Sequence, residues 1–307
     1  MWRQFLVIIL LVSTQCSLAA KKEAELHIII KYKQSMLSVA AIKRQLNSEV
    51  PLSVKEITPI AGNAYTVLFS LDQQATTHFS GDVLDEVLRR LRSSPFIQYA
   101  VEDRVSYFNP FPEINKPAKM KPEMALLSHD LQWDEFLPPG GIMLESIPGL
   151  FDGAWVYTNG EAVPPVVVAV LDTGIAPHES LVNNLVHDEK GEIWGWNFSG
   201  NNRNVADETV SYHGTHVAGT IAAYGQVIKG VGEHLRILPL KIPDFSGMFY
   251  ESQVINAIYW AVGGEVPNIP NNPYPASVLN MSFSVDEKPG KEVDHCDEPL
   301  QEALFFA

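Results

Sequence analysis

The sequence predicts an α/β protein built as two units, an α+β unit followed by a larger unit with a doubly wound parallel sheet. Residues 27–108 alternate between strand-like and helix-like apolar periodicity. From about residue 166 onward, continuous apolar segments alternate with helical ones, a pattern typical of a buried parallel sheet. Between the two units, residues 109–122 contain four prolines and three lysines without apolar periodicity, which indicates an exposed linker.

The first unit is predicted to run strand, helix, strand, strand, helix, strand. Residues 27–32 are a β-branched strand, residues 36–46 a short helix and residues 54–60 a second strand. A Gly62-Asn63 turn leads into a third strand, in which every second residue is apolar and lies on one face: Tyr65, Val67, Phe69 and Leu71.

The last two elements of this unit have the clearest patterns. An apolar stripe at helical spacing predicts a helix: Val83, Val87 and Leu91, with Leu84 and Leu88 beside them. Residues 97–102 alternate again as a strand. The order of elements matches a ferredoxin-like α+β unit, which we expect to close a small core of its own.

The second unit is predicted to alternate strands and helices. Strands are expected at residues 166–171, 235–242 and 277–283, and helices from residue 213 to about 224, over 254–262 and from Glu298 onward. Because these strands are apolar, helices should cover both faces of the sheet. Ala307 lies inside the last predicted helix, so we expect the doubly wound sheet to be incomplete.

The charge of the chain argues against nucleic-acid partners. The 307 residues include 22 basic and 36 acidic side chains, a formal net charge of −14. Such a charge repels nucleic acid and anionic membrane surfaces.

The N-terminus has the pattern of a secretory signal peptide. Arg3 precedes the apolar residues 5–12, and the small residues Ser17, Ala19 and Ala20 follow. The apolar run is shorter than the ~20 residues that span a bilayer. We expect residues 1–20 to be removed, leaving a secreted protein, extracellular or periplasmic, without a membrane partner.

Asp172-Thr173-Gly174 directly follows the first predicted strand of the second unit. In open α/β sheets the carboxyl ends of strands face the ligand crevice, so Asp172 is a candidate catalytic carboxylate. Turn chemistry alone also favours Asp and Gly at this point. Aspartic proteases use Asp-Thr-Gly in a pair of carboxylates, but only one copy occurs here.

A second segment, residues 213–220, reads His-Gly-Thr-His-Val-Ala-Gly-Thr at the start of a predicted helix. The small residues Gly214, Ala218 and Gly219 would let this helix approach the sheet closely and hold His213 in place. A surface histidine, or a metal site built from His213 and His216, would leave the small residues unexplained.

Together these two segments resemble the subtilisin-like serine peptidase family, whose triad runs Asp, His, Ser along the chain. Asp172 and His213 stand 213 − 172 = 41 residues apart, in the family's order and contexts. The segments from Gly230 to Leu240 and from Trp260 to Ser282 are similar to the strands that follow in the family. Residues 27–108 resemble its inhibitory pro-domain.

The resemblance implies that Asp172 orients and stabilises His213, which takes the proton from a serine that attacks the peptide carbonyl. That serine should lie in a Gly-Thr-Ser-Met-Ala-like segment, and the sequence contains none. We therefore expect a truncated, inactive form of a secreted serine endopeptidase.

The resemblance also implies a substrate-binding set: Ser246, Gly247, Ser282, Phe283 and Ser284. Relatives have Ser-Leu-Gly-Gly where this chain has Ser282-Phe283-Ser284-Val285, so the pocket is expected to differ. Calcium is common in the family, but no ligand set for it is recognisable between Tyr224 and Val231, and no other cofactor is identified. Cys296 resembles a cysteine that pairs with a later one in secreted relatives.

Four segments are expected: the signal peptide 1–20, the pro-domain 21–108, a linker and start of the mature region 109–146, and the N-terminal part of the catalytic domain 147–307. The expected partner is a polypeptide substrate or the chain's own pro-domain. In a second hypothesis the chain is not an enzyme, and its pro-domain acts as a chaperone or inhibitor of a related peptidase.

Overall fold

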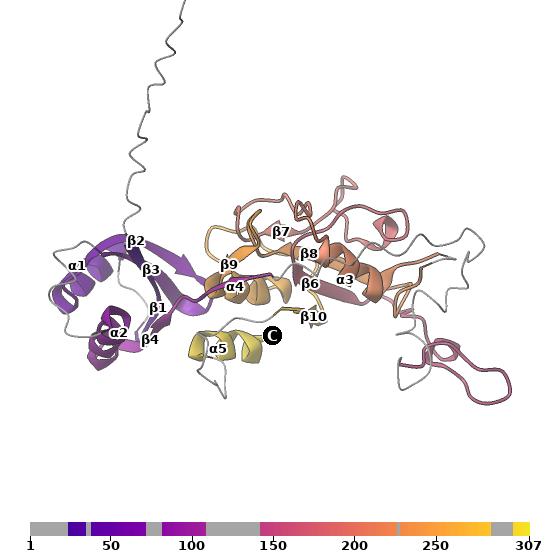
Figure 1. Ribbon diagram of the computed structural model, residues 1–307, viewed down its shortest axis with the longest axis horizontal. Coiled ribbons are helices and arrows are strands. Elements are labelled where there is room, and N and C mark those ends of the chain that lie inside the picture. The colour runs from indigo at the N-terminus through magenta and orange to yellow at the C-terminus, as the bar shows by residue number, and fades with distance from the viewer. Residues whose placement is uncertain (1–23, 35–37, 72–81, 109–141, 226–227, 284–296) are drawn as a thin grey trace, which may run out of the picture.

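The computed structural model describes residues 24–34, 38–71, 82–108, 142–225, 228–283 and 297–307. Two units lie end to end, with the first in indigo and purple and the second in pink to yellow (Figure 1). The expected signal peptide, the linker 109–122, Ser284 and Cys296 lie outside the described residues.

The first unit has the six elements predicted from its sequence. Its antiparallel sheet has the order β2-β3-β1-β4. The bounds are β1 Ala24–Tyr32, α1 Val39–Glu49, β2 Ser53–Ile60, β3 Ala64–Leu71, α2 Val83–Ser93 and β4 Ile97–Glu102, with the short helix η1 Ala61–Asn63 at the predicted turn. The first helix was predicted to begin at residue 36, but α1 begins at Val39, because the Ser38 hydroxyl caps it by accepting from Ala41 N.

The sheet of the first unit is buried on both faces. Ile28 and Ile30 pack towards α1 and α2, whereas Ile29 belongs to a cluster that includes Ile258 of the second unit. All three isoleucines of β1 have no exposed surface. The uninterrupted apolar run of β1 thus reflects a sheet covered on one face by its own helices and on the other by the second unit.

The second unit is built on a parallel sheet with the order β10-β6-β8-β7. Its elements are β6 Val167–Asp172, β7 Trp196–Asn197, α3 His213–Ala222, β8 Arg236–Lys241, β9 Met248–Tyr250, α4 Glu251–Ala261, β10 Val278–Asn280 and α5 Glu298–Phe306. Helices α3 and α4 lie on opposite faces. Val168 and Val170 share a cluster with α3, whereas Ala169 and Leu171 share one with α4.

Several predicted bounds in this unit differ from the structure by one to three residues. The first helix was expected to reach about residue 224, but α3 ends at Ala222 because Ala223 is extended. The strand expected over 277–283 is β10, which ends at Asn280, where its pairing with β6 at Val170 ends. Ser282 and Phe283 therefore lie beyond the strand.

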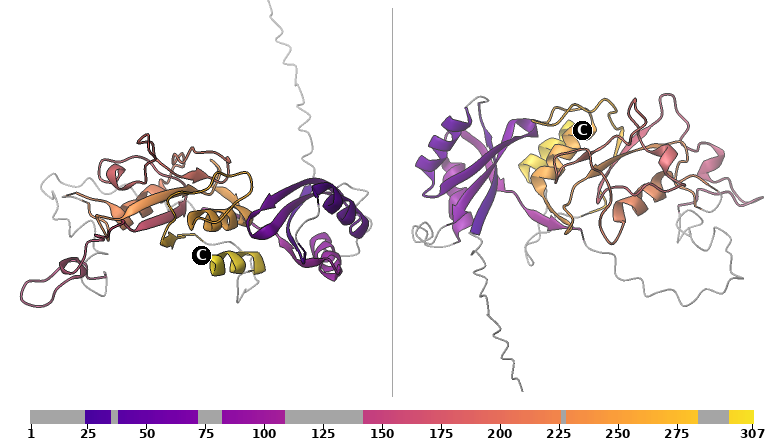
Figure 2. Two further views of the ribbon diagram at one scale, coloured as in Figure 1. Left: turned by 180° about the vertical axis from the view of Figure 1, so that it is seen from behind. Right: turned by 90° about the horizontal axis from the view of Figure 1, so that it is seen from above.

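A short strand, β5 Val105–Tyr107, connects the two units. It belongs to the end of the predicted pro-domain but pairs antiparallel with β9 of the second unit. Figure 2 shows the junction from two further sides, with α5 beside it, and α5 packs against α4 and η1.

Polar contacts also join the units. Ala61 N donates to Asn256 Oδ1 at 2.9 Å, and the Lys31 ammonium pairs with Glu302 at 2.7 Å. The ring of His27 stacks on that of Tyr250, with 4.6 Å between centroids. Among the described helices, none combines the length and apolarity that a membrane crossing requires.

Candidate active site

Asp172 is the last residue of β6, and its side chain is buried. Thr173 N donates to Asp172 Oδ1 at 2.7 Å. The chain then turns sharply at Gly174, whose φ of +117° and contact with Val205 O leave no room for a side chain. This turn keeps the carboxylate at the carboxyl edge of the sheet.

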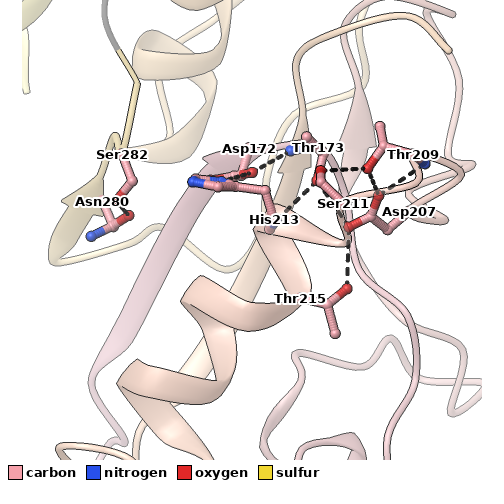
Figure 3. Close-up of polar contacts among 10 residues, drawn as sticks. Asp172, Thr173, Asp207, Thr209, Ser211, His213, Thr215, Asn280 and Ser282 are labelled. Atoms are coloured by element: carbon pink, nitrogen blue, oxygen red, sulfur yellow. Dashed lines mark hydrogen bonds and ion pairs between the residues drawn. The ribbon is translucent and has the colours of Figure 1, made fainter. Parts of the chain in front are cut away.

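His213 is the first residue of α3 and follows Tyr212, which has a left-handed φ of 50°. His213 Nδ1 lies 2.8 Å from both Asp172 Oδ1 and Asp172 Oδ2 (Figure 3). Gly214 makes this approach possible, because a Cβ there would lie 2.4 Å from Gly174 O. Gly219 differs: nothing lies within 4 Å of the point that a Cβ would occupy, so the packing role expected for that glycine is wrong.

Burial raises the pKa of Asp172, and hydrogen bonds from the Thr173 amide and His213 oppose this shift. A carboxylate held at the Nδ1 side of an imidazole fixes the ring's tautomer and orientation. It also stabilises the imidazolium that forms when the other ring nitrogen accepts a proton. The pair therefore has the geometry of an oriented general base.

A second carboxylate, Asp207, connects the end of β6, which carries Asp172, to the first turn of α3, which carries His213. Its Oδ2 accepts from Thr173 Oγ1 at 2.8 Å and from Thr215 Oγ1 at 3.2 Å. Thr173 Oγ1 in turn accepts from Gly214 N at 2.9 Å. Figure 3 shows this cluster beside the Asp172–His213 pair, together with Thr209, whose hydroxyl donates to Asp207 Oδ1. Asp207 was not among the predicted site residues; the threonine in each motif indicates a hydrogen-bond acceptor nearby but not which residue supplies it.

Phe108, directly after β5, also reaches the site. Its ring meets that of His213 edge-on, with 5.8 Å between centroids. It packs at 5.2 Å from the ring of Phe249 and at 5.3 Å from that of Phe283. Phe108 N donates to Gly247 O at 2.9 Å. An extended segment of the first unit therefore lies against the candidate base.

The expected substrate-binding residues have different surroundings. Gly247 and Phe283 both contact Phe108. Ser246 N and Oγ donate to Asp244 Oδ1, which shapes the turn before β9. Ser282 is exposed, and its hydroxyl donates to Asn280 Oδ1 at 2.9 Å. Figure 3 shows Ser282 and Asn280 on the other side of His213 from the Asp207 cluster.

Within the described residues, no group of three or more His, Cys, Asp or Glu side chains gathers as metal ligands. His213 is engaged by Asp172 rather than by a site shared with His216. No step below depends on a metal.

A parallel sheet with a helix on each face, which carries an Asp–His pair at its carboxyl edge, is the architecture of a doubly wound α/β domain. Residues 165–305 match the model of the subtilase family, a family of serine endopeptidases, and this segment of the chain is a subtilase family domain.

The similar proteins are named as proteases. An extracellular basic protease of Dichelobacter nodosus is 25% identical over 87% of this chain and 45% of its own length. An extracellular protease of Xanthomonas campestris is 29% identical over 65% of this chain and 34% of its own length. Subtilisin E of Bacillus subtilis is 24% identical over 86% of this chain and 53% of its own length.

Among solved structures, a protease of Pseudoalteromonas arctica aligns with a TM-score of 0.46 and 29% identity, over 57% of this chain and 53% of that chain. This chain spans roughly a third to a half of the length of the three curated relatives named above.

Proposed function

We propose that the second unit is the part of a subtilisin-like serine endopeptidase that carries the aspartate and histidine of the triad. The observation that carries this proposal is the 2.8 Å contact between His213 Nδ1 and the buried Asp172 carboxylate. In this proposal His213 accepts the proton of a serine hydroxyl as it attacks a peptide carbonyl, and Asp172 stabilises the resulting imidazolium. The substrate is a polypeptide.

We propose further that the first unit is a ferredoxin-like inhibitory pro-domain, so that the chain is the front part of a zymogen. The antiparallel strand order β2-β3-β1-β4 supports this proposal. So does the pairing of β5 with β9, because an extended peptide that adds a strand to β9 is how a substrate would bind. Phe108 then stands where a substrate side chain would contact His213.

The sequence contains no Gly-Thr-Ser-Met-Ala-like segment, so we propose that these 307 residues alone do not hydrolyse peptides. In subtilisin, loss of the triad serine alone lowers kcat by ~10⁶, about as much as loss of all three residues. The same β5–β9 pairing supports a second function. The first unit could bind the equivalent strand of a related peptidase as a chaperone or inhibitor.

Labelling with a fluorophosphonate, which reacts with activated serines, tests the proposal. The 307-residue chain should remain unlabelled. A chain extended with the serine-bearing segment of a relative should be labelled, and His213→Ala should abolish this. His216→Ala is the matched control, because His216 is exposed on the same helix. Labelling of the 307-residue chain that depends on His213 would overturn the inactivity proposal, and an extended, folded chain that is never labelled would overturn the peptidase proposal.

We also propose that the protein is secreted, on the strength of its N-terminal pattern and of relatives named as extracellular proteases. N-terminal sequencing of exported protein should then begin at Ala20 or Lys21. Exported protein that retains Met1 would contradict this proposal.

A further inference from the structure

A buried ion pair lies at the amino-terminal end of the β5–β9 ladder. Arg104 Nε donates to Glu251 Oε2 at 2.8 Å, and the Glu251 side chain has no exposed surface. Arg104 Nη2 lies 3.4 Å from Asp297 Oδ2, at the start of α5. One guanidinium thus joins carboxylates from two helices of the second unit.

The main chain fixes Arg104 at this position relative to the catalytic pair. Glu251 N donates to Arg104 O at 3.0 Å, and Phe108 N donates to Gly247 O, so the hydrogen bonds continue at both ends of β5. Arg104 precedes Phe108 by 108 − 104 = 4 residues. The peptide that contacts His213 is therefore held in a single register.

Alternate residues of this segment face the second unit. Ser106 is buried and Phe108 packs on His213, whereas Val105 and Tyr107 are exposed. Arg104 lies on the same face as Ser106 and Phe108, as expected for an extended chain with a two-residue period. The surface thus accommodates a basic, a small and an aromatic side chain at alternate positions.

Glu251 is a fully buried acidic residue on the surface of the second unit that β5 covers. Its second carboxylate oxygen, Oε1, is buried, and no described residue forms a hydrogen bond with it. Burial raises the pKa of Glu251, and the hydrogen bond and charge of Arg104 oppose this rise. Without a cation the carboxylate would be buried and uncompensated, which is strongly unfavourable. A neutral side chain in place of the guanidinium would leave this carboxylate without its counter-charge.

We propose that Glu251, together with Asp297, forms a subsite that selects extended polypeptides with an arginine four residues before the side chain that contacts His213. This inference rests on the proposed function, because it names the class of peptide bound at the same site. The planar guanidinium reaches both carboxylates through separate nitrogens, whereas a lysine ammonium offers a single point of charge. Arginine should therefore be preferred to lysine, and lysine to glutamine.

The first test uses the chain's own strand as the bound peptide. Hydrogen exchange of residues 104–108, measured by mass spectrometry on the full chain, reports how often β5 leaves β9. Arg104→Gln should speed this exchange at least ten-fold and Arg104→Lys less. In a Glu251→Gln background, the exchange rates of chains with Arg and with Gln at position 104 should become nearly equal. Glu265→Gln, at an exposed loop position after α4, is the matched control and should change nothing.

The second test uses peptides added to a full chain that carries Ser106→Trp. Ser106 is 1% exposed, so tryptophan should displace the chain's own strand. Acetyl-Arg-Val-Ser-Tyr-Phe-amide should bind at least ten-fold more tightly than its Gln counterpart, and Glu251→Gln should abolish this preference.

Equal binding of the two peptides, or a preference that survives Glu251→Gln, would overturn the proposal. If neither peptide binds, the first test decides. Equal hydrogen-exchange rates of residues 104–108 with Arg, Lys or Gln at position 104 would then overturn the proposal. Both tests read binding rather than hydrolysis. Failure of the subsite therefore leaves the peptidase proposal intact, and failure of serine labelling leaves the subsite intact.

Discussion

At the scale of single residues, the site depends on one carboxylate that is not itself part of the Asp–His pair. Asp207 accepts hydrogen bonds from Thr173, directly after β6, and from Thr215, in the first turn of α3. The same two segments are also joined by the hydrogen bond from Gly214 N to Thr173 Oγ1 and by the close approach of Gly214 to Gly174. Asp207 is thus a positioning residue, which acts on Asp172 and His213 through the two threonines.

Replacing Asp207 should therefore loosen the end of β6 and the start of α3 at once. Asp207→Ala leaves the buried hydroxyl of Thr173 and the half-buried hydroxyl of Thr215 without their acceptor, and a buried group that loses its partner typically costs about 1–3 kcal/mol. We expect a lower urea midpoint and a shifted NMR resonance of the His213 ring, since the ring loses its fixed orientation. Asp152→Ala, at an exposed position, is the control. A folded Asp207→Ala chain with unchanged His213 resonances would exclude the positioning role.

The sequence identified Asp172 and His213 as partners because the two motifs that carry them resemble, in residues and order, those of one peptidase family. It could not identify Asp207, since five residues that suit turns lie close together there: Asn202, Asn204, Asp207, Thr209 and Ser211. Which of them becomes buried depends on how the loop folds over Thr173. Phe108 was missed for a related reason: its partners, Phe249 and Phe283, lie far along the chain.

At the scale of elements, long periodic segments were predictable and short pairings were not. The apolar stripe of α2 located that helix, because four of its residues, Leu84, Val87, Leu88 and Leu91, form one buried face. Strand β5 has only three residues and pairs with a strand about 140 positions away, so no local pattern could reveal it. Ser277–Phe283 looked like a full strand because apolar composition alone does not show where pairing stops.

The amino-terminal end of α4 is held by a side chain of the first unit. Asp103, from the end of the first unit, accepts from Ser252 N at 2.9 Å and from Ser252 Oγ at 2.7 Å. Asp103 is 4% exposed. Burial raises its pKa to about 7, the Ser252 hydrogen bonds oppose this rise, and the neighbouring charges of Glu251 and Glu102 add to it.

This shift predicts that the docked chain loses stability as the pH rises from about 4 to about 7. Across that interval the folded chain retains a proton on Asp103 that an unfolded chain, with an ordinary aspartate pKa near ~3.9, has released. The contribution of Asp103 to the free energy of unfolding is complete below ~pH 4. It declines above that pH with a slope of at most ~1.4 kcal/mol per pH unit. Urea midpoints at pH 5.5 and 7.5 should differ less for Asp103→Asn than for the parent. Equal differences would contradict the assignment.

At the scale of the whole molecule, the two units share a core. The face of the first sheet that carries Ile29, Tyr99 and Val101 packs in one cluster with Ile258 and other residues of α4. The opposite face carries Ile28 and Ile30 and is closed by α1 and α2. The first unit was predicted to close a core of its own, and it does so on one face of its sheet only. The second face depends on the other unit for its burial.

Ile28 and Ile29 offer a matched pair to test this division, because they are adjacent, chemically identical and both fully buried. In the full chain, alanine at either position should cost about 2–5 kcal/mol, as core truncations do. In an isolated 24–108 fragment, Ile28→Ala should keep that cost. Ile29→Ala should cost less than about 1 kcal/mol, because the face it occupies is already in water. Urea unfolding followed by circular dichroism measures all four values. Equal costs of the two substitutions in the fragment would show that the first unit buries this face without the second, and that the shared core contributes little to holding the units together.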